Sequence, residues 1–379
     1  MRHGKNGEIN MYKQFNNVYK GKTVLVTGHT GFKGSWLTMW LLSLGAKVVG
    51  YSSYLPSEPN NFEASKIADH IVDIRGDIRD YESLKKVFLD HKPEIVFHLA
   101  AQPIVRRSFE QPKLTFDTNI SGSVNVLECI RTTSSVVAAV MITSDKCYKN
   151  VEWTWGYREN DTLGGDDPYS ASKGAAELVC HSYIASYFGK GVSKSRVCTV
   201  RAGNVIGGGD WADDRIIPDC VKAWSKGEIL SIRNPEATRP WQHVLEPLSG
   251  YLWTGANIYM DEKLSGEAFN FGPDAKVNKS VRELIERLSM YWDKVKSQKD
   301  NDAQKNKNKE SVLLKLCCDK ALHSLGWHSV LSFEDTVKMT AEWYKNYYDK
   351  KDVNVYDFSM KQINHYVEEA KKQTLPWVG

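Results

Sequence analysis

The chain has 379 residues, of which 41% are hydrophobic and 25% charged, a composition typical of a soluble globular protein large enough for two domains. Its 50 basic and 46 acidic residues leave a net charge of only +4, without a basic stripe interleaved with aromatics, so no nucleic acid partner is expected. Residues 1–20 are polar, and no apolar run is as long as a membrane span. The sequence therefore predicts a cytoplasmic protein with no membrane partner.

Cysteine usage indicates thiols rather than disulfides or metal ligands. The seven cysteines are scattered singly, except for the adjacent Cys317 and Cys318. No CxxC pair is present that could complete a zinc site. We therefore expect reduced structural thiols and no bound metal.

Short β-branched runs alternate with longer helical patterns over the first 203 residues. Strands are predicted at 23–27, 47–51, 70–73, 94–98, 136–143 and 196–200, and helices at 36–44, 80–90, 115–132 and 169–188. This βαβ rhythm predicts an α/β fold with a doubly wound parallel sheet of the Rossmann type, in which ligands bind at the carboxyl ends of the strands.

The pattern loosens after Gly203 into loops with glycine and proline, and a helix is predicted at 332–348. We expect a polar extension at 1–20, a dinucleotide-binding domain at 21–203, and a mainly substrate-binding part at 204–379 with segments that return to the first domain. The segment 294–310 is poor in apolar residues and rich in Lys, Asn and Asp, which is typical of a solvated, mobile loop.

A glycine-rich turn, residues 28–34 (GHTGFKG), lies between the first predicted strand and the helix that follows. In this context Gly28 permits a tight turn, Gly31 lets the backbone approach a pyrophosphate, and Gly34 lets the helix pack close to the strand. A plain turn rich in glycine is the alternative.

The second strand ends in residues 49–53 (VGYSS), which include no carboxylate to bind a ribose hydroxyl. The choice between NAD and NADP is therefore open at this strand. Lys33 could face a 2′-phosphate and so favour NADP, or it could contact a diphosphate or solvent.

Three further positions are candidates for contacts with a dinucleotide. Asp77 could accept a hydrogen bond from an adenine amino group or cap the next helix, for which Asp80 is the better candidate. The small residues near the end of the fourth strand, 99–101, would let a cofactor lie flat against the backbone. Asn119 could hold backbone geometry or a water molecule, or be an exposed helical residue.

Tyr169 and Lys173 lie one helical turn apart in the helix predicted at 169–188. The Lys173 ammonium can therefore lie beneath the Tyr169 phenol and favour the phenolate, which would take a hydroxyl proton near neutral pH. Asp145 and Lys146 add an acid and an amine that a simple alcohol dehydrogenase does not need. The set predicts oxidation and elimination in one pocket, and a polar turn at a strand end is the alternative.

These segments resemble the extended short-chain dehydrogenase/reductases that act on nucleotide sugars, over about residues 22–348. The glycine turn, the Asp77-Ile78 pair, the strand end at 98–101 and the Tyr169/Lys173 pair carry the resemblance. Five strings resemble the branch of that family that dehydrates CDP-glucose: 31–36 (GFKGSW), 101–103 (AQP), 143–148 (TSDKCY), 201–212 (RAGNVIGGGDWA) and 239–247 (RPWQHVLEP).

The resemblance implies a 4,6-dehydratase that acts on CDP-glucose with NAD, which is regenerated in each turnover. Tyr169 would remove the C4 hydroxyl proton, Ser144 would hydrogen-bond the same oxygen, and Asp145 would protonate the departing C6 hydroxyl. Lys146 stands where most relatives carry a glutamate that removes the C5 proton. It would be that base, with a lowered pKa, or an electrostatic stabiliser of the enolate.

The same resemblance implies three sets of site residues. The catalytic set is Ser144, Asp145, Lys146, Tyr169 and Lys173. The cofactor contacts are Gly28, Thr30, Gly31, Phe32, Lys33, Gly34, Asp77, Ile78, Leu99, Ala100, Ala101, Asn119, Tyr169 and Lys173. The substrate contacts are Gln102, Ser144, Asn204, Arg215, Arg233 and Arg239, of which the arginines suit a diphosphate. As alternatives, Arg215 and Arg233 could be solvated or form structural ion pairs, and Gln102 could cap its strand.

Two other functions compete with this one. A 4,6-dehydratase or 4-epimerase of another nucleotide sugar would share the fold, but an epimerase needs no elimination couple, so Asp145 and Lys146 argue against it. A non-catalytic dinucleotide-binding protein would have lost part of the active set, and all of that set is present.

A homodimer is expected, because relatives commonly dimerise through the helices predicted here at 115–132 and 169–188. Apolar positions on these helices could serve the interface or pack on the sheet. They are Val124, Leu127, Ala175 and Leu178.

Overall fold

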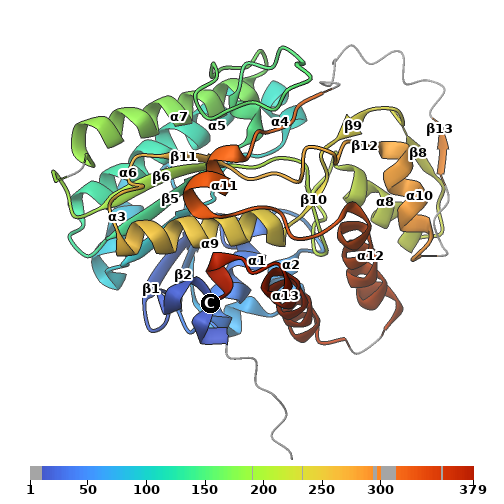
Figure 1. Ribbon diagram of the computed structural model, residues 1–379, viewed down its shortest axis with the longest axis horizontal. Coiled ribbons are helices and arrows are strands. Elements are labelled where there is room, and N and C mark those ends of the chain that lie inside the picture. The colour runs from blue at the N-terminus through green and yellow to red at the C-terminus, as the bar shows by residue number, and fades with distance from the viewer. Residues whose placement is uncertain (1–10, 190, 233, 293–296, 300–312, 351–352) are drawn as a thin grey trace, which may run out of the picture.

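The computed structural model describes residues 11–189, 191–232, 234–292, 297–299, 313–350 and 353–379. Its centre is a sheet of seven parallel strands in the order β11-β6-β5-β4-β1-β2-β3 (Figure 1). The strands are β1 Thr23–Thr27, β2 Lys47–Ser52, β3 Val72–Arg75, β4 Ile95–His98, β5 Ala138–Ile142, β6 Arg196–Arg201 and β11 Ala268–Asn270. The doubly wound sheet predicted from the sequence is confirmed.

Helices cover both faces of this sheet. Leu25 of β1 belongs to a core formed with α3 (Tyr81–His91), α6 (Gly122–Thr132) and α7 (Pro168–Tyr187). Its neighbours Val24 and Val26 belong to the opposite core, formed with α1 (Phe32–Ser43), α9 (Leu245–Met260) and α13 (Val355–Lys372). Because successive strand residues face opposite layers and both layers are buried, the central strands β1, β4 and β5 are buried over nearly their whole length.

Several elements differ from the sequence prediction. β3 begins two residues after the start of the predicted strand 70–73, because Ile67–His70 form a 3-10 turn. The predicted helix at 115–132 consists of α5 (Pro112–Phe116), a π-helical turn at Asp117–Ser121, and α6. Helix α1 begins at Phe32 rather than near residue 36.

A smaller part lies beside the carboxyl ends of the strands and appears on the right in Figure 1. It contains α8 (Ile216–Ser225), α10 (Val281–Ser289), α12 (Phe333–Asp349) and three pairs of short strands. The pairs are β7 Val205–Ile206 with β10 Gln242–His243, β8 Leu230–Ile232 with β13 Ser297–Lys299, and β9 Thr238–Arg239 with β12 Lys279–Ser280. The remaining helices are α2 (Asn61–Ala64), α4 (Val105–Glu110) and α11 (Asp319–Leu325).

Part of the sequence prediction falls outside the described residues. Within the loop predicted at 294–310, residues 297–299 form β13, and the remainder is not described. Of the polar extension at 1–20, residues 1–10 lie outside the description and Met11–Asn17 form 3-10 turns. Over the part of the chain that is described, no helix is both long and apolar enough to cross a membrane.

Candidate active site

A cavity of about 2150 Å3 opens where the strand order reverses between β1 and β4. This switch point is where parallel α/β sheets bind their ligands. The wall includes most of the predicted site residues: Gly28, Thr30, Gly31, Phe32, Lys33, Gly34, Asp77, Ile78, Leu99, Ala100, Ala101, Gln102, Ser144, Asp145, Lys146, Tyr169, Lys173, Asn204, Arg215 and Arg239. Two predicted residues are not among them, since Asn119 lies behind the wall and Arg233 lies outside the described residues.

The glycine turn forms a cradle that larger residues would fill. Gly28 has a φ of +75°, and a Cβ there would lie 2.7 Å from the backbone nitrogen of Ala100. A Cβ on Gly34 would lie 2.1 Å from the carbonyl oxygen of Gly28. Gly31 precedes α1 without a side-chain cap, so the first N–H groups of that helix remain available for an anion. The turn therefore fits the diphosphate of a dinucleotide.

The acid and amine lie on a 3-10 turn, Asp145–Cys147, that follows β5. Ser144 caps this turn, since its hydroxyl oxygen accepts the N–H of Lys146 at 3.2 Å. The same hydroxyl donates to Oδ1 of Asp145 at 2.8 Å. Ser144 and Asp145 are buried, at 6% and 5% exposure, so this hydrogen bond is shielded from water.

Tyr169 and Lys173 come from the first two turns of α7, which Asp167 caps by accepting the N–H of Ser170. Burial raises the pKa of Tyr169 to about 12, although a hydrogen bond with Ser144 acts in the opposite direction. Burial also lowers the pKa of Lys173 to about 8. The prediction that Lys173 would favour a phenolate near neutral pH is therefore wrong for the protein groups alone, because burial is the largest influence on both pKa values and disfavours both charged forms.

Beneath this pair lies a buried ion pair that sequence reasoning missed. Glu177, one turn after Lys173, accepts from Nε and Nη2 of Arg201 on β6, each at 2.8 Å. It also accepts from the hydroxyls of Thr143 and Thr199. Burial by itself raises the pKa of Glu177, but these donors outweigh it and the pKa lies below its ordinary value. The network joins α7 to the strand ends that carry the acid and the amine.

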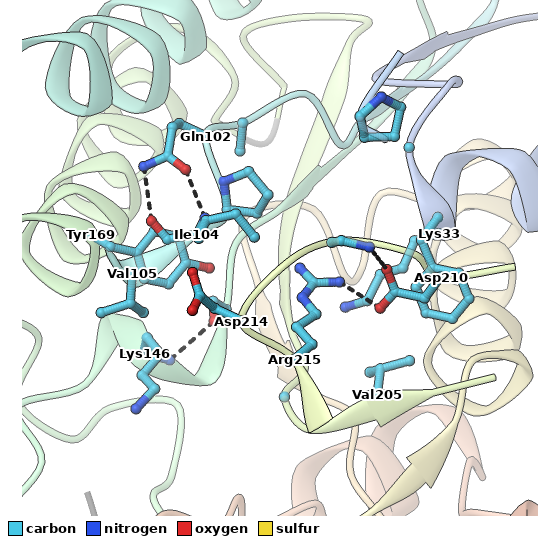
Figure 2. A pocket seen from close by; sticks show the side chains of 18 of the residues that line it. Lys33, Gln102, Ile104, Val105, Lys146, Tyr169, Val205, Asp210, Asp214 and Arg215 are labelled. Atoms are coloured by element: carbon cyan, nitrogen blue, oxygen red, sulfur yellow. Dashed lines mark hydrogen bonds and ion pairs between the residues drawn. The ribbon is translucent and has the colours of Figure 1, made fainter. Parts of the chain in front are cut away.

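Lys33 lies beside Asp210 in the cavity, with Arg215 between them and the side of Tyr169 and Lys146 (Figure 2). Burial lowers its pKa to about 8, and the nearby positive charges of Arg215 and Lys173 add to this effect. Nη1 of Arg215 pairs with Oδ2 of Asp210 at 2.8 Å. The charged groups that act on Lys33 are therefore Arg215, Asp145, Lys173 and Asp210.

Gln102 and Asn119 support the wall. The side-chain amide of Gln102 donates to the carbonyl oxygen of Ile104 and to Thr115, and its oxygen accepts the N–H of Ile104 (Figure 2). Asn119 accepts the N–H of Gln102 and donates to Ser172. Gln102 therefore holds the backbone after its strand, which matches the alternative considered for it. Asn119 is buried and holds the backbone of Gln102, so the alternative of an exposed helical residue is wrong.

Asp77 lies at the adenosine end of the predicted cofactor site. Its carboxylate accepts from the backbone and the guanidinium of Arg79, which lowers the pKa of Asp77. The helix cap at α3 is Asp80, as the sequence predicted. Asp77 therefore faces the cavity as an ionised group that is already paired.

The substrate side of the cavity carries Asn204 and Arg239. Asn204 adopts the left-handed conformation, with a φ of +53°, at the turn between β6 and β7. Arg239 lies on β9, and its Nη1 donates to the carbonyl oxygen of Thr238 at 2.8 Å. Within the described ranges no group of three His, Cys, Asp or Glu side chains could hold a metal ion.

Comparison with known proteins agrees with this geometry. The family model described as GDP-mannose 4,6 dehydratase matches residues 25–340. The chain is 44% identical to a CDP-glucose 4,6-dehydratase of Salmonella typhimurium over 364 residues, which cover 94% of this chain and 99% of the relative. It is 24% identical to a dTDP-glucose 4,6-dehydratase of Xanthomonas campestris over 85% of this chain and 93% of the relative.

A solved structure shares the fold. The dTDP-glucose 4,6-dehydratase DesIV of Streptomyces venezuelae, with NAD and TYD bound, superposes with a TM-score of 0.70 at 24% identity. The match covers 86% of this chain and 97% of DesIV. The chain therefore belongs to the GDP-mannose 4,6-dehydratase family of extended short-chain dehydrogenase/reductases.

Proposed function

We propose that this protein is a lyase that converts CDP-glucose to CDP-4-dehydro-6-deoxyglucose and water. The observation that carries the proposal is the buried Asp145, followed by Lys146, in the same cavity as Tyr169 and Lys173. The similarity to the Salmonella enzyme over nearly the whole chain supports CDP-glucose as the substrate. The product would serve deoxysugar synthesis for polysaccharides of the O-antigen type.

The residues divide the reaction into proton transfers at C4, C5 and C6. Tyr169 takes the C4 hydroxyl proton, and Ser144 hydrogen-bonds the same oxygen. The resulting ketone acidifies the C5 hydrogen, and Asp145 gives its proton to the departing C6 hydroxyl. Lys146 adjoins Asp145 and acts on C5, either as the base that takes the C5 proton or as the cation that stabilises the enolate while a water molecule or another group takes that proton.

The cofactor in this proposal is NAD. When bound, it supplies the oxidation at C4 and returns the same hydride to C6, so no external reductant is consumed. The glycine cradle at Gly28 and Gly34 and the uncapped start of α1 would hold its diphosphate. Lys173 would bind its ribose and keep Tyr169 in place.

The diphosphate of the sugar nucleotide would lie against Arg215 and Arg239, since guanidinium groups bind phosphate oxygens in pairs. Asn204 would contribute a polar contact from the turn between β6 and β7. Arg233 was predicted for the same role and lies outside the described residues.

The protein would act as a homodimer in the cytoplasm. Leu178 on α7 is 59% exposed, whereas Leu127 on α6 is fully buried against the sheet. This difference supports an interface on the outer face of α7. Light scattering of the purified protein tests it, with Leu178→Glu expected to shift the mass toward that of one chain.

Product analysis tests the function directly. The purified protein is incubated with NAD and, separately, with CDP-, UDP-, dTDP- and GDP-hexoses, and the products are weighed by mass spectrometry. We expect CDP-glucose alone to lose one water, with no net reduced cofactor. Water loss from another nucleotide sugar would overturn the substrate, and an isomer of unchanged mass would overturn the reaction.

A further inference from the structure

The loop at residues 207–215 carries Arg215 into the cavity and holds its guanidinium at one end. Nη1 of Arg215 pairs with Oδ2 of Asp210 at 2.8 Å (Figure 2). Oδ1 of the same carboxylate accepts the N–H of Ala212 at 3.1 Å, so both carboxylate oxygens of Asp210 are engaged. Within the described part of the chain, this arrangement leaves Nε and Nη2 of Arg215 for the oxygens of a phosphate.

Asp210 is in turn held by Tyr344, which belongs to α12. The Tyr344 hydroxyl accepts the backbone N–H of Asp210 at 3.0 Å and donates to the backbone carbonyl oxygen of Asp210 at 2.5 Å. Both residues are buried, at 4% exposure for Asp210 and 1% for Tyr344, so water does not replace these hydrogen bonds. Tyr344 is not among the residues that line the cavity, so its effect on a ligand passes through Asp210.

The same loop is tied to helices of both parts of the molecule. A Cβ on Gly208 would lie 1.9 Å from Cγ of Trp343, so α12 packs directly against the loop. Nε1 of Trp36 in α1 donates to the carbonyl oxygen of Gly208 at 2.9 Å. Nε1 of Trp211 donates to the hydroxyl of Tyr348 in α12 at 2.9 Å. The loop therefore has a defined position between α1 and α12.

We propose that Tyr344 positions Arg215 for the diphosphate of the nucleotide sugar. This role rests on the proposed function, in which Arg215 binds that diphosphate. The Tyr344 hydroxyl fixes the backbone of Asp210, and the Asp210 carboxylate fixes the guanidinium of Arg215. Because a guanidinium binds phosphate oxygens through two N–H groups in one plane, its orientation decides how well it binds. Tyr344 is a positioning residue and does not touch the substrate.

A purely structural role in the aromatic packing of α12 is the competing explanation. The Tyr344 ring packs edge-on against Trp211, with 5.7 Å between ring centroids, and against Trp343, with 5.4 Å. Tyr344→Phe keeps this ring and removes only the hydroxyl. The variant therefore separates the two hydrogen bonds to Asp210 from the packing.

Calorimetric titration of the NAD-loaded protein with CDP measures the diphosphate site without turnover. We expect Tyr344→Phe to weaken CDP binding by roughly tenfold or more, and the KM for CDP-glucose to rise by a similar factor. The kcat and the Kd for NAD should change by less than about twofold. Tyr348→Phe is the matched control, because it removes a hydroxyl that binds Trp211 in the same loop but not Asp210. It should leave CDP binding unchanged.

A double-mutant cycle separates positioning from packing. Arg215→Met should weaken CDP binding by itself, and the addition of Tyr344→Phe should weaken it no further, since Tyr344 acts through Arg215. A further loss in the double variant would contradict the proposal, because it would show that Tyr344 acts by another path.

The remaining outcomes distinguish this role from the proposed function. Unchanged CDP binding in either Tyr344→Phe or Arg215→Met would overturn the role of Tyr344. Equal losses of CDP and NAD affinity in Tyr344→Phe would indicate a change in folding and would also contradict it. Wild-type protein that binds CDP but dehydrates no nucleotide sugar would contradict the proposed function alone, and the CDP titrations would still decide the role of Tyr344.

Discussion

The carboxyl group of Asp145 rests against a position that only glycine can occupy. A Cβ on Gly203 would lie 1.9 Å from Oδ2 of Asp145, a distance that no pair of unbonded atoms tolerates. The backbone there cannot retreat freely, because the Gly203 carbonyl accepts from Nε2 of Gln242. Gly203 therefore sets how deeply Asp145, the proposed acid, lies in the cavity wall.

Gly203→Ala should displace Asp145 and lower kcat by on the order of 10²-fold, since small misplacements of a reacting group are that costly. Steady-state kinetics measure the change in kcat. Gly189→Ala is the matched control, because its Cβ would meet nothing closer than 3.7 Å. An unchanged kcat in Gly203→Ala would mean that Asp145 is not the acid.

Asp145→Asn tests the division of labour between oxidation and elimination. The amide keeps the shape of the carboxyl group but has no acidic proton for the C6 hydroxyl, so we expect kcat to fall by roughly 10²-fold or more. Oxidation at C4 depends on Tyr169 and should continue. Stopped-flow absorbance should then show reduced nicotinamide accumulating on the enzyme. Bound substrate without this absorbance would contradict the assignment.

Local spacing in the sequence predicts the residues that act within one turn of each other, and little else about the site. The sequence predicts the pairs Tyr169/Lys173 and Asp145/Lys146, because the two residues of each pair are close together in the chain. The pair of Glu177 and Arg201 is not predicted, since it joins a helix to a strand 24 residues further on. The position of Lys33 is equally invisible, because its neighbours Asp145 and Arg215 come from distant segments.

Among the elements, α9 shows why a strongly buried helix escapes sequence reading. Residues 245–256 are all buried, so apolar residues surround the helix and no 3.6-residue period appears. Six of the seven strands of the sheet, by contrast, are predicted from the sequence, whereas β11 is not. The π-helical turn at Asp117–Ser121 left no signal, because it inserts a residue without changing composition.

Helix α9 is tied to the C-terminal segments through a buried acid. Glu246 in its first turn accepts the N–H groups of Val330 and Leu331 and the hydroxyl of Tyr366. Burial raises the pKa of Glu246 to about 7, although these donors act against it. At pH values between the ordinary pKa of a glutamate and about 7, Glu246 is protonated in the native state and ionised in the unfolded state. The stabilisation this provides is complete below that window and is lost as the pH rises through 7.

Glu246→Gln should therefore have a stability close to wild type at pH 5 and exceed it at pH 8 by about 3 kcal/mol. The glutamine oxygen can still accept from Val330 and Leu331, and its amide can donate to Tyr366. Urea unfolding at the two pH values measures the difference. Exposed Glu262→Gln serves as the control and should alter neither value. An equal effect of Glu246→Gln at both pH values would show that Glu246 is ionised throughout.

At the scale of the whole molecule, the active site is a region where the fold holds ionisable groups away from water. Lys173 and Lys33 have pKa values near 8 because of burial, and Tyr169 is held neutral to about pH 12. Each of these pKa shifts reflects the free-energy cost of burying the charged form of a side chain. Where the protein needs that charged form, the cost opposes folding. The large apolar cores on both faces of the sheet offset it.

Lys173→Met should accordingly inactivate the enzyme and make it more stable. Below pH 8 the native state of the wild type carries a buried ammonium, whose removal should stabilise the fold by about 3 kcal/mol at pH 7. Between pH 8 and 10.5 the native lysine has lost the proton that the unfolded chain still binds, so wild-type stability rises with pH. The stability advantage of Lys173→Met should shrink over this pH window and vanish above it.

Urea unfolding at several pH values measures the difference in stability between Lys173→Met and wild type, and exposed Lys361→Met is the control. The tyrosines titrate alike in the two proteins, so their contribution cancels from the difference. A stability difference that does not depend on pH would mean that Lys173 has an ordinary pKa. A variant less stable than wild type would mean that the attraction between Lys173 and Glu177 outweighs the cost of burying Lys173.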